Sequence, residues 1–311
     1  MTTSPKTPRT PLRRLIAATA AAAAMALAAP AAGALPALPP LPGAPVPAPA
    51  GDRAPAAPWV VFGDSYAANP VIPASSIFAG HDPRAAERHP VPSFAPGCEQ
   101  DFHNWPRVAA RAAGVGDRGL ADYSCNGDGR LPVKTLYDHV DAATARGHLG
   151  RGTQKVFLMY GALNTLQWAD TVTGVAGQSP LPRAYTAELR GFAEKVRAAA
   201  PGAEIIIVGY PEIADGDRVC PVDTTGTPLS LIVPGVAGLE EGVRGTLATS
   251  AAAVGARFID MKPLTAGHGM CAAPEQRYVS GVYDTVSNHN MKFHPTIEGS
   301  KAMGEIIARQ V

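Results

Sequence analysis

The sequence predicts a single α/β domain in which a mostly parallel, doubly wound sheet lies between two layers of helices. Short apolar strands such as 155–160 and 204–208 alternate with longer segments of helical periodicity. Strands without polar alternation are typical of a parallel sheet that is covered on both faces. About 250 residues follow a proline-rich stretch, enough for one well-cored domain and short of two. These observations favour a three-layer α/β/α sandwich.

The first 57 residues are expected to lie outside this domain. Basic residues between Lys6 and Arg14 precede an Ala-rich apolar segment that ends in small residues at 32–34. This is the pattern of a secretory signal peptide, which we assign to residues 1–34. A retained membrane anchor is the alternative, although alanine is weakly hydrophobic and Pro30 interrupts the segment. Residues 35–57, rich in Pro and Ala, predict an extended linker to a domain at 58–311.

Charge and motif content argue against several classes of function. The chain has 27 basic and 26 acidic residues, and residues 1–34 hold four basic and no acidic ones, so the mature balance is 23 − 26 = −3. This balance does not favour nucleic acid or an anionic membrane as a partner. The sequence has no HExxH motif, Cys/His cluster, P-loop or dinucleotide fingerprint, and no Gly-x-Ser-x-Gly elbow. No metal and no cofactor are therefore expected.

The strands and helices are expected in alternating order along the chain. The first strand runs from Trp59 to Phe62, and later segments are assigned from apolar periodicity and from stops such as Gly114 and Pro201. Further strands are predicted at 119–125, 155–160, 204–208 and 256–260, and helices at 102–113, 136–149, 184–200, 239–254 and 296–311. The segments 66–97 and 261–293 lack sustained periodicity and are expected to form the walls of a pocket.

A candidate nucleophile, Ser65, follows the first strand in the sequence Gly-Asp-Ser-Tyr at 63–66. Ligands of parallel sheets gather at the carboxyl ends of the strands, so a reactive serine belongs at this place. A serine hydroxyl is a poor nucleophile unless a base accepts its proton. His294, just before the last predicted helix, is expected to be that base.

The chain resembles the SGNH (GDSL-type) hydrolases, a family of serine esterases and lipases, and in particular secreted actinobacterial members. The resemblance rests on the sequence at 63–66 after the first strand, followed in order by Gly127, Asn164 and His294-Pro295. It implies the flavodoxin-like SGNH form of the α/β/α sandwich. It also implies that the protein is an enzyme that acts through an acyl-enzyme on Ser65.

The same resemblance implies three donors to the oxyanion: the amide of Ser65, the amide of Gly127 and the side chain of Asn164. Gly129 competes with Gly127 for the second role. The third block departs from the family pattern. Its glycine lies three residues before Asn164 rather than two, and a threonine follows where the family has aspartate.

The partner that orients His294 also departs from the family pattern. An aspartate three residues before the histidine is usual, and this chain has Met291 there. Similarity to members that lack this aspartate implies a Ser65–His294 dyad, in which the backbone oxygen of Met291 accepts the Nδ1 proton. The rival is Asp284, ten residues before His294.

The four cysteines form an even set in a chain that we expect to be secreted, which favours disulfides over metal ligation. Four cysteines allow three pairings, and the sequence alone does not choose among them. The resemblance implies Cys98–Cys125 and Cys220–Cys271.

The predicted function is that of a secreted serine esterase or lipase that cleaves a small-molecule, lipid or glycan ester. Val282, Tyr283, Met291 and Phe293 near His294 would accommodate an acyl chain, unless they belong to the core. The alternative is a non-catalytic cell-envelope protein or acyl-ligand binder with a degenerate site. We expect a monomer, outside the cell or associated with the cell envelope.

Overall fold

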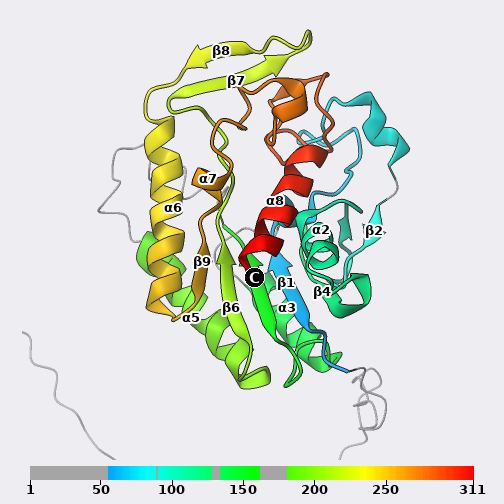
Figure 1. Cartoon of the computed structure of the whole chain (residues 1–311), viewed down its shortest axis with the longest axis vertical. Coiled ribbons are helices and arrows are strands. Elements are labelled where there is room, and N and C mark those ends of the chain that lie inside the picture. The colour runs from blue at the N-terminus through cyan, green and yellow to red at the C-terminus, as the bar shows by residue number, and fades with distance from the viewer. Residues whose placement is uncertain (1–54, 89, 128–133, 162–180) are drawn as a thin grey trace, which may run out of the picture. The chain divides into compact units, whose positions relative to one another are not determined.

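The computed structural model describes residues 55–88, 90–127, 134–161 and 181–311. The predicted signal peptide and residues 35–54 of the predicted linker lie outside these ranges. The described residues form the α/β sandwich that the sequence predicts (Figure 1). No helix within them is both long enough and apolar enough to span a lipid bilayer.

Five parallel strands form the central sheet, in the order β4-β1-β5-β6-β9. Their bounds are β1 Trp59–Gly63, β4 Leu120–Asp122, β5 Lys155–Met159, β6 Glu204–Val208 and β9 Arg257–Ile259. Val61 pairs with Phe157, which pairs with Ile206, and all three side chains are fully buried. Helices cover both faces of the sheet, so each central strand needs apolar side chains on both sides. The predicted parallel sheet is confirmed.

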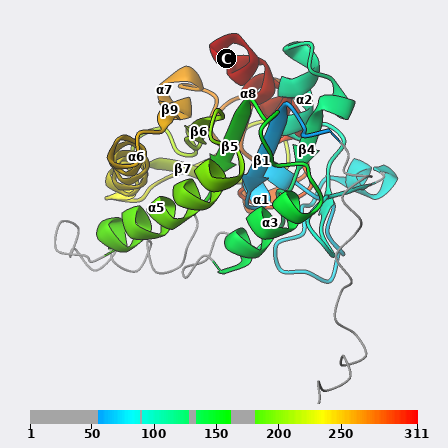
Figure 2. The same ribbon diagram turned by 90° about the horizontal axis from the view of Figure 1, so that it is seen from below.

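The helices lie in two layers. Helices α2 (Trp105–Ala112) and α8 (Ile297–Gln310) lie on one face, and α3 (Lys134–Ala145) and α5 (Leu181–Ala199) on the other, with α6 (Val236–Ala253) beside α5 (Figure 2). Gly304 allows α8 to approach α2, because a Cβ there would lie 2.6 Å from the Cβ of Val108. The hydroxyls of Thr186 and Ser250, 2.8 Å apart, join α5 to α6.

A second, three-stranded sheet at the top of Figure 1 is absent from the sequence prediction. It contains β7 (Arg218–Asp223), β8 (Leu229–Ile232) and β10 (Tyr283–Asp284), in the order β10-β7-β8. Pro221 inside β7 argues against a strand when it is read locally, and the two residues of β10 are too few to give a pattern. Pairing between segments distant in sequence forms this sheet.

The two segments predicted to be irregular contain only short elements. They are α1 (Ser65–Ala68), the 3₁₀ helix Pro83–Glu87, β2 (Val91–Pro92), α7 (Met261–Leu264), the 3₁₀ helix Pro274–Gln276 and β10. Outside these segments, β3 (Glu99–Gln100) pairs with β2, and the 3₁₀ helix Asp117–Gly119 precedes β4. Both disulfides that the resemblance implies are formed. Cys98–Cys125 joins the segment before α2 to the segment after β4, and Cys220–Cys271 joins β7 to the segment after α7.

Candidate active site

Ser65 lies at the carboxyl edge of the sheet, as the first residue of α1. The buried side chain of Asp64, which caps this helix, accepts hydrogen bonds from the amide of Tyr66 (3.0 Å), the amide of Gly161 (3.1 Å) and the hydroxyl of Tyr210 (2.5 Å). Gly161 and Tyr210 follow β5 and β6, so this carboxylate joins the ends of three neighbouring strands. These contacts fix the turn that carries Ser65.

His294 reaches Ser65 from the other end of the chain, on the turn before α8. Its Nε2 lies 2.7 Å from Ser65 Oγ, and its Nδ1 lies 2.6 Å from the carbonyl oxygen of Lys292. A carbonyl only accepts hydrogen bonds, so Nδ1 carries the proton and Nε2 accepts from the serine hydroxyl. Burial lowers the pKa of His294 to about 4, against a smaller opposing effect of the Lys292 carbonyl. The imidazole is therefore neutral at pH 7.

The carbonyl that orients His294 belongs to Lys292, so the prediction of Met291 is wrong. The Met291 carbonyl instead accepts a hydrogen bond from the hydroxyl of Ser280 at 2.8 Å. The reason lies at Phe293, whose φ of 58° places it in the left-handed region. The resulting tight turn lets the carbonyl of Lys292, two residues before His294, face the imidazole ring of His294. A left-handed conformation is uncommon for a bulky residue, which marks a strained backbone beside the pair.

Asp284, the rival partner for His294, is engaged elsewhere. Its carboxylate accepts hydrogen bonds from Arg277 Nη1 at 2.7 Å and from Ser287 Oγ at 2.6 Å. Burial alone would raise the pKa of Asp284, but the hydrogen bonds from Ser287 and Arg277 lower it to about 2. The buried Arg277 also forms an ion pair with Asp223 at 2.5 Å. Asp284 is therefore a structural anchor in the second sheet.

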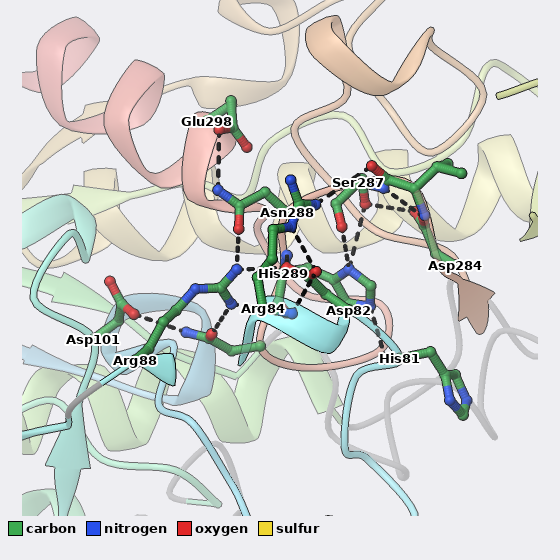
Figure 3. A network of polar contacts seen from close by, with 12 residues as sticks. His81, Asp82, Arg84, Arg88, Asp101, Asp284, Ser287, Asn288, His289 and Glu298 are labelled. Carbon is green, nitrogen blue, oxygen red and sulfur yellow. Dashed lines mark hydrogen bonds and ion pairs between the residues drawn. The ribbon is translucent and has the colours of Figure 1, made fainter. Parts of the chain in front are cut away.

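A network of polar contacts holds the segment that leads to His294 against the loop after α1 (Figure 3). Asp82 accepts from Arg84 Nε at 2.8 Å, from Arg88 Nη2 at 2.5 Å and from the amide of His289 at 3.1 Å. The ring of His289 in turn accepts from the amide of His81, 3.2 Å from Nε2. These contacts join segment 81–88 to segment 284–290 and so fix the path of the chain before the proposed base.

Asn69 contributes to the site, and the sequence reasoning misses it. This fully buried residue ends α1 in the left-handed conformation, with φ 44°. Its Nδ2 donates to the Pro295 carbonyl at 3.0 Å, and its own carbonyl accepts from Asn290 Nδ2 at 2.7 Å. Asn69 thus ties the helix that carries Ser65 to the turn that carries His294. The available signal was an asparagine before a proline, since asparagine tolerates this conformation.

Two of the three predicted oxyanion donors lie within the described residues. The Ser65 amide is the first N–H of α1, a group that has no acceptor within its own helix. Gly127 has a φ of 86°, which suits glycine, and it follows Cys125, whose amide donates to the last carbonyl of β1 at 2.9 Å. Asn164 and Gly129 lie outside the described residues. Within the described ranges, no group of three His, Cys, Asp or Glu side chains could hold a metal ion.

An apolar pocket of about 490 Å³ has Tyr210 and Phe293 in its lining, whereas Ser65 and His294 are not part of it. The two segments predicted as pocket walls contribute Phe78, Lys262, Met270 and Phe293 to it, whereas most of its lining comes from residues after β6, from β7 and from α6. The prediction of the walls is therefore incomplete. Of the apolar residues expected near an acyl chain, Phe293 lines the pocket and Met291 is buried.

The fold and the Ser65–His294 contact are those of a serine hydrolase built on a parallel α/β sheet. Residues 61–302 match the model of the GDSL-like lipase/acylhydrolase family, and the chain belongs to this family. The resemblance read from the sequence is thereby confirmed, and the protein is a carboxylic-ester hydrolase.

Two known proteins illustrate this relationship. The chain is 26% identical to Lipase 2 of Streptomyces coelicolor over 286 residues, which cover 83% of this chain and 86% of the relative. Its fold is similar to that of the extracellular lipase from Streptomyces rimosus, with a TM-score of 0.51 and 19% identity over 81% of this chain and 98% of the other. At this identity the structural likeness shows the fold alone.

Proposed function

We propose that the protein is a secreted serine esterase or lipase that cleaves carboxylic esters through an acyl-enzyme on Ser65. The observation that carries the proposal is the pair of contacts at His294: 2.7 Å from Nε2 to Ser65 Oγ, and 2.6 Å from Nδ1 to the Lys292 carbonyl. Nucleophile and base lie within hydrogen-bond reach, and the base is held in the required tautomer by a third group.

In the proposed reaction His294 Nε2 accepts the Ser65 proton while Oγ attacks the ester carbonyl carbon. The negative charge that develops on the carbonyl oxygen is stabilised by the amides of Ser65 and Gly127 and by the side chain of Asn164. Nε2 then donates its proton to the leaving alcohol, and a water activated by the same nitrogen releases the acid. The Lys292 carbonyl stabilises the transient imidazolium less than a carboxylate would.

Location and assembly extend the same proposal. The amino-terminal pattern of residues 1–34 and the two disulfides both suit an oxidising compartment outside the cytoplasm. We propose that the enzyme acts as a monomer on esters outside the cell or at the cell envelope.

The experiment compares wild type, Ser65→Ala and His294→Ala in the hydrolysis of p-nitrophenyl acetate and in labelling by a fluorophosphonate probe. Both variants should lose at least a thousandfold in kcat, because nucleophile and base act as a unit. Ser230→Ala, which changes an exposed serine of β8, is the matched control and should keep full activity and labelling. Substantial hydrolysis by Ser65→Ala would overturn the assignment. Absence of labelling in wild type would instead support the non-catalytic alternative.

A further inference from the structure

Tyr66 directly follows the proposed nucleophile in sequence and also contacts the proposed base. It is fully buried, and its ring centroid lies 4.8 Å from that of the His294 imidazole. The ring of Tyr210 packs edge-on against it, with 5.2 Å between centroids. The amide of Tyr66 donates to Asp64 at 3.0 Å, so the carboxylate that fixes the turn of Ser65 also fixes this residue. These contacts hold the ring beside the base.

The hydroxyl of Tyr66 donates a hydrogen bond to the carbonyl oxygen of Phe293, the residue before His294. A carbonyl only accepts hydrogen bonds, so this contact needs a protonated phenol. Burial raises the pKa of Tyr66 well above its ordinary value of 10, and the carboxylates of Asp64 and Glu240 raise it further. The hydroxyl therefore remains a donor from acid to mildly alkaline pH.

Phe293 is the residue at which the chain turns towards the base. Its φ of 58° lies in the left-handed region, which is unfavourable for a side chain of this size. Such a conformation persists only where the surrounding contacts hold it. Because the peptide unit is planar, a hydrogen bond to the Phe293 carbonyl fixes the plane that joins Phe293 to His294. The Tyr66 hydroxyl thus acts on the peptide directly before the imidazole.

Other carbonyls of this turn are held from the opposite side. Ser280 donates from its hydroxyl to the Met291 carbonyl at 2.8 Å and from its amide to the His294 carbonyl at 3.0 Å. Between these fixed points the Lys292 carbonyl faces the ring, 2.6 Å from Nδ1. The Tyr66 contact comes from α1 and so links the turn to the helix that carries the nucleophile.

We propose that Tyr66 is a positioning residue for His294, because its hydroxyl holds the Phe293 carbonyl and with it the left-handed turn. In this turn the Lys292 carbonyl faces Nδ1 and supplies the orientation that an aspartate supplies in a Ser-His-Asp triad. The inference rests on the proposed dyad, and it gives the residue after the nucleophile a role that the acyl-enzyme mechanism alone does not require.

Tyr66→Phe removes the hydroxyl and keeps the ring. Its kcat on p-nitrophenyl acetate should fall about tenfold, which corresponds to ~1.4 kcal/mol, the size of the net contribution of one hydrogen bond. KM should stay within about twofold, because the buried hydroxyl donates to a main-chain carbonyl and not to the substrate. Tyr137→Phe is the matched control. Its hydroxyl donates to the Glu188 carbonyl at 2.8 Å between α3 and α5, and its loss should leave kcat unchanged.

NMR of isotope-labelled histidine measures the orientation of the base directly. The Nδ1 proton of His294, assigned by its absence in His294→Ala, should be protected from exchange with water in wild type. Tyr66→Phe should exchange this proton at least tenfold faster, whereas Tyr137→Phe should exchange it as wild type does. Wild type should also show nuclear Overhauser effects between the ring protons of Tyr66 and His294, which tests the contact even if Tyr66→Phe does not fold.

The outcomes separate this inference from the proposed function. If the Nδ1 proton exchanges as slowly in Tyr66→Phe as in wild type, if kcat is unchanged, or if wild type shows no contact between the two rings, the positioning role is wrong while the serine mechanism stands. Equal losses of kcat in Tyr66→Phe and Tyr137→Phe would also overturn the role. If the exchange depends on Tyr66 but wild type hydrolyses no ester, the positioning role stands and the serine mechanism is wrong.

Discussion

Asp284→Asn separates a carboxylate triad from a dyad oriented by a main-chain carbonyl. The carboxylate is fully buried and accepts from Arg277 at 2.7 Å and from Ser287 at 2.6 Å. Its pKa of about 2, against an ordinary value of 3.8, corresponds to roughly 2 kcal/mol of stability at pH 7. Breaking one half of a buried ion pair typically costs 3–5 kcal/mol. Because Arg277 keeps its pair with Asp223, we expect a loss of about 3 kcal/mol.

In a domain of this size, each kcal/mol shifts the Tm by roughly 2–4 °C, so Asp284→Asn should melt about 6–12 °C lower than wild type. At a temperature where the variant is folded, its kcat on p-nitrophenyl acetate should stay within about tenfold of wild type, because the orienting acceptor is the Lys292 carbonyl. Urea unfolding and steady-state kinetics on the same preparation measure both quantities.

Asp223→Asn is the matched control, since it removes the other carboxylate from the same arginine. It should cost a similar amount of stability and leave kcat unchanged. A loss near a thousandfold in kcat for Asp284→Asn, with an unchanged Tm, would refute the reasoning and establish a carboxylate triad.

Two further predictions concern pH and redox state. Burial lowers the pKa of His294 from 6.5 to about 4, so the unfolded chain takes up a proton on this imidazole at a higher pH than the folded protein does. The free energy of unfolding should therefore fall as the pH drops from 6.5 towards 4, by at most about 3 kcal/mol. Urea unfolding at pH 7 and pH 4.5 should show a smaller decrease for His294→Phe than for wild type, and equal decreases would contradict the lowered pKa of His294. Replacing Cys220 and Cys271 together by serine removes a bridge between residues 51 apart in sequence. In the chain-entropy model this should lower the free energy of unfolding by about 4 kcal/mol, measured by urea unfolding. An unchanged urea midpoint would show that the bridge does not stabilise the fold.

The central sheet and its active edge could be predicted because they depend on patterns that are local in sequence. Strands buried on both faces must be apolar throughout, so β1, β5 and β6 are visible as unbroken apolar runs. The serine lies two residues after the end of β1, and the histidine lies three residues before the start of α8, so the boundaries of those elements place both. The contact between them then follows from the topology of the fold.

The remaining features depend on contacts between distant segments, which carry no local pattern. Asn69 donates a hydrogen bond to the carbonyl of Pro295, 226 residues away in sequence, and Arg277 donates to the carboxylates of both Asp223 and Asp284. The short strands of the second sheet are stable only because they pair with each other.

The sequence by itself thus determined the parallel α/β sheet, the family and the two residues of the proposed dyad. Strands buried on both faces must be apolar along their whole length, and the two residues of the dyad lie close to the ends of elements that this pattern predicts. Only the tertiary structure decided which carbonyl orients His294, which partners occupy Asp284 and where the apolar pocket opens. These depend on a single left-handed residue, Phe293, and on how the loops pack over the carboxyl ends of the strands. Side chains from distant parts of the chain meet there, and their hydrogen bonds and close packing are settled only when the whole domain has folded.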